Sequence, residues 1–222
     1  MSSVRDAVRG RAGGVFVTFE GGEGAGKSTQ LLSVAAHARD AGWQVVTCRE
    51  PGGTALGERL RAALLELETP PDAVAELLVF AAARAQLVAQ VIRPALAAGA
   101  LVLCDRFADS TYAYQQYGRG LDPALVDAAN AAATGGLLPA LTVLLDLDPA
   151  VGSGRGAAGG SDYLEREAAA FHERVRAGYR ARAAAEPGRW LVLDGARAAA
   201  ELTAAIWGRV AALAETPRVS GD

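Results

Sequence analysis

The glycine-rich segment at residues 21–28 constrains this chain more than any other feature. It reads Gly-Gly-Glu-Gly-Ala-Gly-Lys-Ser, which is a complete GxxxxGKS phosphate-binding loop. An apolar and β-branched run precedes the loop at residues 15–19, and a helical pattern follows from residue 30. A strand, a glycine-rich turn and a helix in this order are the context that the motif requires. The sequence therefore predicts a nucleoside triphosphate site inside an α/β fold.

The loop residues have separate expected roles. Gly21, Gly24 and Gly26 are expected to adopt positive φ, so that backbone N–H groups can approach a phosphate closely. Lys27 is expected to reach the β- and γ-phosphates, and Ser28 to ligate Mg²⁺. Lys27 is also the only lysine among 22 lysines and arginines, which suggests a position that needs a compact ammonium group. The residues expected to bind ATP are Gly21, Gly22, Glu23, Gly24, Ala25, Gly26, Lys27, Ser28 and Thr29.

Strand-like and helical runs alternate along the rest of the chain, which predicts a parallel sheet with helices on both faces. The expected strands are residues 15–20, 43–48, 100–105, 141–147 and 190–194. The expected helices are residues 27–41, 55–68, 72–97, 107–117, 122–134, 164–186 and 198–214.

The length of 222 residues fits one domain at 14–215, with an arm at 1–13 and a tail at 216–222. Half of the ten residues from Gly152 to Ser161 are glycine, so this stretch is expected to hold no rigid element and to be either a mobile lid, over about 150–163, or a disordered loop.

Charge and hydropathy exclude several classes of partner. The net charge is −3 and there is no long basic run, which argues against binding to nucleic acid or to an anionic membrane. No apolar run approaches the roughly 20 residues of a spanning helix, and the start of the chain lacks the apolar middle of a signal peptide. A cytoplasmic protein is expected.

Polar residues gather where the first three predicted strands end. These ends carry Glu20, then Arg49-Glu50-Pro51-Gly52-Gly53-Thr54, then Asp105-Arg106. Ligands of open parallel sheets bind at the carboxyl ends of the strands. Asp105 suits an Mg²⁺ carboxylate, bound directly or through water, and Arg106 suits a phosphate clamp. A salt bridge between the two at the strand end is the alternative.

With these motifs and two further stretches, the chain resembles the thymidylate kinases of the bacterial type. The further stretches are Phe80-Ala81-Ala82-Ala83-Arg84, and Asp105-Arg106-Phe107 followed by Ser110-Thr111-Tyr112-Ala113-Tyr114-Gln115. The resemblance covers about residues 14–215. It implies a P-loop fold with a five-stranded parallel sheet, and Mg²⁺-assisted phosphorylation of dTMP by ATP in a cytoplasmic homodimer.

The resemblance also implies roles for single residues. Phe80 stacks on thymine, Arg84 donates to a thymine carbonyl, and Thr111 and Gln115 reach the base edge. Tyr114 closes the 2′ side of the sugar, Arg49 and Arg106 hold the acceptor phosphate, and Glu23 meets the 3′-hydroxyl or a metal-bound water. The alternative for Phe80 and Arg84 is a core aromatic with a surface arginine on one helix.

The lid departs from the family pattern. A P-loop without a basic residue between its glycines goes with arginines in the lid, but Arg155 is the only cation between Val151 and Glu165. Arg155 is therefore a predicted catalytic residue, with Lys27, Asp105 and Arg106, and Arg166 is the alternative source of this charge. Two other functions stay open: a kinase for another nucleoside monophosphate or a nucleoside, and a non-catalytic nucleotide-binding protein.

Overall fold

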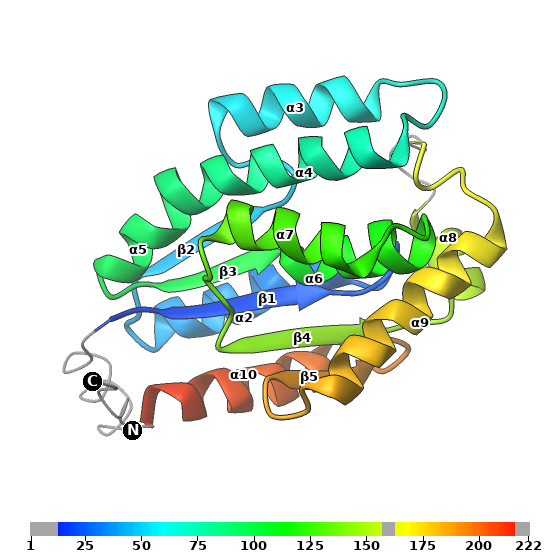
Figure 1. Ribbon diagram of the computed structural model, residues 1–222. Helices are drawn as coiled ribbons and strands as arrows, with labels where there is room; N and C mark the ends of the chain where they lie inside the picture. Colours follow the sequence, from blue (N-terminus) through cyan, green and yellow to red (C-terminus); the bar gives the residue numbers. More distant parts are fainter. Residues whose placement is uncertain (1–12, 157–162, 216–222) are drawn as a thin grey trace.

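The structure is a computed structural model that describes residues 13–156 and 163–215 as a three-layer α/β fold (Figure 1). Within these residues, five parallel strands form one sheet in the order β2-β3-β1-β4-β5. The strands are β1 (Val15–Glu20), β2 (Val45–Arg49), β3 (Leu101–Asp105), β4 (Leu141–Asp146) and β5 (Trp190–Asp194). The predicted fold class is confirmed, and each predicted strand overlaps an observed one.

The alternation of side chains along β1 divides the core between the two faces of the sheet. Val17 and Phe19 pack with α2 (Lys27–Asp40) and α10 (Ala199–Glu215). Phe16 packs on the opposite face, where α4 (Ala73–Leu87) and α5 (Arg93–Ala97) lie, and α9 (Ala169–Ala185) covers the β4 side of that face. Both faces are buried, so every residue of β1 is apolar or hydrogen-bonded inside the protein.

α4 continues through the π-helical turn η1 (Val88–Ile92) into α5, and α3 (Ala55–Leu65) packs beside it (Figure 1). In the part of the chain that the structure describes, Ala73–Ala97 is the one helix long and apolar enough to cross a membrane. The expectation that no apolar stretch approaches this length is therefore wrong. The helix nevertheless buries Glu76 and Arg84 in contacts with other elements, as a core helix does.

The segment after β3 is helical as predicted, but it is not one α-helix. It consists of α6 (Ala108–Thr111) and the π-helix η2 (Tyr112–Gly118), and α7 (Pro123–Thr134) follows. The Asp122 side chain accepts from the Ala124 amide at 2.8 Å and so caps the start of α7, where Pro123 is the first helical residue. π-Helical turns are frequent at functional sites, and η2 carries Tyr114 and Gln115.

Two predictions around the lid are wrong. α8 (Pro149–Gly156) is a helix that includes the first part of the glycine-rich stretch. Asp148 caps it by accepting from the Ala150 amide at 2.9 Å. Gly152 packs against the P-loop so closely that an added Cβ would lie 2.3 Å from the Glu23 carbonyl oxygen, so glycine here serves backbone contact rather than mobility.

The second wrong prediction is the start of α9, which begins at Ala169 rather than at residue 164. Glu167 pairs with Arg119 instead of continuing a helix. The predicted arm at 1–13 and tail at 216–222 lie almost wholly outside the described residues, as does the end of the predicted lid.

Candidate active site

The P-loop lies between β1 and α2, at the carboxyl edge of the sheet (Figure 1). Gly21, Gly24 and Gly26 have φ of 137°, 65° and 90°, so the predicted positive φ values are confirmed. A Cβ at Gly24 would lie 2.1 Å from the carbonyl oxygen of Gly152. Glycine is needed there because the conformation and the close backbone contact both exclude a side chain.

Lys27 is buried and its ammonium group lies inside the loop. Nζ donates to the carbonyl oxygens of Gly21 at 3.1 Å and Gly22 at 2.7 Å. Burial lowers the pKa of Lys27, and the Arg106 guanidinium lowers it further. A phosphate at the loop would offset both effects, since it brings negative charge to two neighbouring cations.

Ser28 and Asp105 form the part of the site that suits a divalent cation. Ser28 Oγ donates to Asp105 Oδ2 at 2.6 Å, so a hydroxyl oxygen and a carboxylate oxygen lie side by side next to the P-loop. No group of three or more His, Cys, Asp or Glu side chains that could hold a metal occurs among the described residues. This donor set fits Mg²⁺, which takes one or two protein oxygens and completes its shell with water and phosphate.

Arg106 links the P-loop to the third strand end. It adopts a φ of 67°, the one positive value of a non-glycine residue in the described chain. Its Nη1 donates to the Gly21 carbonyl at 3.1 Å, and its Nη2 pairs with Glu23. The Arg106 guanidinium lowers the pKa of Glu23 to about 2, so this carboxylate stays ionised at neutral pH. Strained backbone of this kind persists where the surroundings hold it, often at functional sites.

A buried hydrogen-bond chain holds Arg106 from behind. Arg106 Nη1 donates to the Tyr179 hydroxyl at 3.1 Å, and that hydroxyl donates to Glu20 Oε2 at 3.0 Å. Glu20 also accepts from Ser110 Oγ at 2.6 Å and from the Phe107 amide at 2.8 Å. Burial, with the nearby charge of Asp109, raises the pKa of Glu20 to about 7.

A cavity of about 260 Å³ connects the P-loop to the predicted acceptor residues. All of the predicted acceptor residues line it, together with Lys27, Ser28 and Asp105: Glu23, Arg49, Phe80, Arg84, Arg106, Thr111, Tyr114 and Gln115. The structure thus brings together residues from five parts of the chain. Phe80 is half-buried at this cavity, whereas Tyr114 is buried and packs its ring near the Arg106 guanidinium.

Arg84 is neither a surface arginine nor a free donor. It is 2% exposed, with Nε donating to Glu50 Oε2 at 2.8 Å and Nη1 donating to Thr111 Oγ1 and Asn130 Oδ1. Nη2 donates to the Phe107 carbonyl and pairs with Glu50. Every N–H group of this side chain has a protein acceptor, so contact with a ligand requires one of these bonds to be shared or exchanged.

The remaining predicted cations are placed differently. The Arg49 guanidinium is exposed at the cavity and pairs with Glu58 at 2.9 Å. Arg166 donates to the carbonyl oxygens of Leu67 and Glu68, beyond the end of α3. The side chain of Arg155 lies outside the described residues. The structure therefore joins Arg166 to the α3–α4 connection and leaves the predicted role of Arg155 untested.

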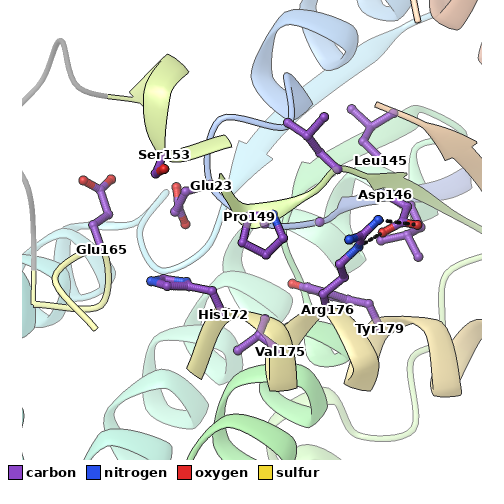
Figure 2. Close-up of a pocket in the computed structure, with 14 residues that line it drawn as sticks. Glu23, Leu145, Asp146, Pro149, Ser153, Glu165, His172, Val175, Arg176 and Tyr179 are labelled. Atoms are coloured by element: carbon purple, nitrogen blue, oxygen red, sulfur yellow. Dashed lines mark hydrogen bonds and ion pairs between the residues drawn. The ribbon is translucent and has the colours of Figure 1, made fainter. Parts of the chain in front are cut away.

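A second cavity, of about 270 Å³, also borders Glu23 (Figure 2). Figure 2 shows His172, Val175, Arg176 and Tyr179 facing it from one helix, α9. Arg176 is held by Asp146, with Nε donating to Oδ1 at 2.7 Å. Because Glu23 and Glu165 line both cavities, the two spaces adjoin at the P-loop.

Sequence reasoning gave no role of its own to Glu50 and missed Glu76 and Tyr179. Glu76 precedes Phe80 by one helical turn, which is a signal that could have placed it on the same face. Tyr179 is 73 residues from the arginine that it contacts, and nothing local marks it.

Comparisons with known proteins agree with one another. The thymidylate kinase family model matches residues 19–206. A thymidylate kinase of Solidesulfovibrio magneticus is 53% identical over 208 residues, covering 90% of this chain and 100% of that protein. A thymidylate kinase of Deinococcus radiodurans is 52% identical over 198 residues, covering 89% and 96%. The crystal structure of thymidylate kinase from Ehrlichia chaffeensis is similar with a TM-score of 0.74 and 33% identity, covering 89% of this chain and 98% of that one.

Proposed function

The chain belongs to the thymidylate kinase family and phosphorylates dTMP to dTDP with ATP, and we propose that the P-loop and the cavity beside it bind the two nucleotides. The observation that carries this proposal is the cavity that Lys27 and Ser28 share with Phe80, Tyr114 and Gln115. A phosphate donor on the loop and a nucleotide in the cavity would lie next to each other. The comparisons do not favour a kinase for another acceptor or a non-catalytic binder.

The acceptor would enter the cavity with its base against Phe80. Stacking on an aromatic ring is worth about 1–3 kcal/mol for any base, so base identity must be read by other groups, among which we place Arg84, Thr111 and Gln115. Tyr114 would close the sugar side. Arg106 and Arg49 would hold the acceptor phosphate, and for that each guanidinium must share or leave its present carboxylate, Glu23 or Glu58.

Mg²⁺ would be held by Ser28 and Asp105, whose oxygens already lie together, with Glu23 as a further contact through water. When bound, the ion neutralises charge on the donor phosphates. Lys27 would turn from the Gly21 and Gly22 carbonyls to these phosphates, since its compact ammonium group is carried on a flexible side chain.

Phosphoryl transfer needs in-line positioning and charge neutralisation, and no side-chain nucleophile. Arg106 is suited to hold the acceptor oxygen in line, because Tyr179 and Gly21 anchor its Nη1. Glu23 would meet the 3′-hydroxyl of the sugar or a metal-bound water. Arg155 would add positive charge from the lid at residues 150–163.

We further propose that the protein acts in the cytoplasm as a homodimer and binds neither nucleic acid nor membranes. The net charge of −3 and the absence of a long basic run in the sequence support the last point.

A coupled assay with Mg·ATP and a series of monophosphates tests the acceptor assignment. We expect kcat/KM to be highest for dTMP, lower for dUMP, and poor for dCMP and UMP. The dUMP deficit should stay moderate because one methyl group in an apolar pocket is worth only about 1–3 kcal/mol. Faster use of dCMP or of a ribonucleotide than of dTMP would show that the cavity residues are assigned wrongly.

A further inference from the structure

The side chain of Gln115 lines the acceptor cavity, and its carboxamide has two chemically opposite ends. Its Nε2 donates to Glu76 Oε1 at 2.7 Å. Glu76 is fully buried, and its two oxygens also accept from Arg119, at 3.3 Å from Nε and at 3.0 Å from Nη2. The Glu76 carboxylate is therefore held in place by a guanidinium on one side and by the Gln115 amide on the other.

An ionised carboxylate only accepts hydrogen bonds, so the NH₂ end of Gln115 must face Glu76. The oxygen end, Oε1, then faces the cavity. In residues 13–156 and 163–215, no group donates to this oxygen. Glu50 Oε1 also lacks a donor but is fully buried, whereas Gln115 Oε1 is not. The cavity thus presents a fixed acceptor that has no partner within the described protein.

The pyrimidine bases differ at the position that such an acceptor would meet. Thymine and uracil carry a donor, N3–H, whereas cytosine has an unprotonated N3 that is itself an acceptor. We infer that Glu76 is a positioning residue that selects thymine over cytosine by holding the Gln115 oxygen toward N3. This inference rests on the proposed function, because it requires dTMP to bind in this cavity.

The position of Glu76 supports this reading. Glu76, Phe80 and Arg84 follow one another at intervals of four residues, so they share one face of α4. The same helix would therefore supply the stacking ring and the group that orients Gln115. Arg84 is less suited to reading the base, since all of its N–H groups already have protein acceptors.

The variant Glu76→Gln tests the inference. An amide at position 76 can donate as well as accept, so Gln115 becomes free to turn its NH₂ group to the cavity and donate to N3 of cytosine. We expect the ratio of kcat/KM for dCMP to kcat/KM for dTMP to rise about tenfold, the size of effect that one mismatched buried polar group produces. The ratio for dUMP to dTMP should not change, because both bases carry N3–H.

Glu167→Gln is the matched control. It removes the same charge from the same guanidinium, because Glu167 also pairs with Arg119, but within the described contacts it does not touch Gln115. Its dCMP to dTMP ratio should equal that of the unmodified protein. Glu76→Asp keeps an acceptor-only group and should retain thymine preference even where overall kcat/KM falls.

Three outcomes overturn the inference: an unchanged ratio in folded Glu76→Gln, an equal rise in Glu167→Gln, or an equal rise in Glu76→Asp. If Glu76→Gln does not fold, Gln115→Met is the second test, because it removes the cavity acceptor while leaving the Glu76–Arg119 pair. It should raise the ratio of kcat/KM for dCMP to kcat/KM for dTMP. An unchanged ratio in this variant would also overturn the inference. Failure of the unmodified protein to prefer dTMP would instead refute the acceptor site itself.

Discussion

The two sides of the active site are built in different ways. The P-loop side is mostly backbone: three glycines at positive φ, one lysine bound to carbonyl oxygens, and a helix start. The acceptor side is built from interlocked side chains, in which Arg84 joins Glu50 to Thr111 and Glu76 joins Gln115 to Arg119. Phosphate recognition thus depends on local backbone shape, whereas base recognition depends on groups that distant segments bring together.

This difference predicts how mutations act. On the P-loop side, a side chain that faces phosphate can be removed with a large loss of rate and a small loss of stability. On the acceptor side, removal of one member leaves a buried partner without its hydrogen bonds, so stability and specificity change together.

The largest expected effect concerns Arg155. If Arg155 stabilises the transferring phosphoryl group as an arginine finger does, Arg155→Ala should lower kcat by about 10³–10⁵. Arg166→Ala is the control, since Arg166 donates to carbonyl oxygens beyond α3, and it should cost less than about tenfold. Single-turnover rates with saturating ATP and dTMP measure both. A large loss for Arg166→Ala alone would transfer the role to that residue.

Lys27→Ala should lower kcat/KM by about 10³-fold, comparable to the loss of a strong donor to transition-state charge. The melting temperature should change little, because the two lost hydrogen bonds both go to carbonyls of the same loop and burial already disfavours the charged ammonium group. His37→Gln, exposed on the same helix, is the matched control for both measurements. A variant that melts several degrees lower but keeps its activity would show that Lys27 is structural and would remove the contrast between the two sides.

Arg84→Met should destabilise the fold by about 3–5 kcal/mol, because it leaves the Glu50 carboxylate buried without its cation. Arg49→Met breaks an ion pair of the same type, but an exposed one, and should cost no more than about 1 kcal/mol. Urea unfolding of both variants gives the difference. Adding Glu50→Gln to Arg84→Met should restore part of the lost free energy of unfolding. If Arg84→Met and Arg49→Met lowered the free energy of unfolding equally, the buried network would be contradicted.

The smallest expected effect is a pH dependence from Glu20. Its pKa is raised to about 7 in the folded protein, against 4.5 as its ordinary value, so the folded state binds the proton more tightly. Its contribution is therefore fully present below pH 4.5 and is lost as pH rises to about 7. Relative to Glu20→Gln, the unmodified protein should lose at most about 3 kcal/mol across this range. If the melting temperatures of the two proteins changed by the same amount across this pH range, the raised pKa of Glu20 would be refuted.

The sequence by itself determined the parts whose geometry is local. The P-loop, the polar residues at the strand ends and the Asp-Pro start of α7 could be predicted from local patterns, because each depends on backbone conformation within a few residues. The residues around the cavity were predicted from the resemblance to a family, and not from spacing. The start of α9 and the helix α8 could not, since contacts of Glu167 and Gly152 with distant segments override the local pattern.

Only the tertiary structure decided what the acceptor residues do with their hydrogen bonds. It placed Arg84 inside a saturated network, joined Tyr179 to Arg106, and set Glu76 against Gln115. These pairs are separated by 34, 73 and 39 residues along the chain, where the separation of 34 joins Arg84 to Glu50. Sequence spacing cannot show such contacts, because burial in the folded core is what forces each polar group to find a partner.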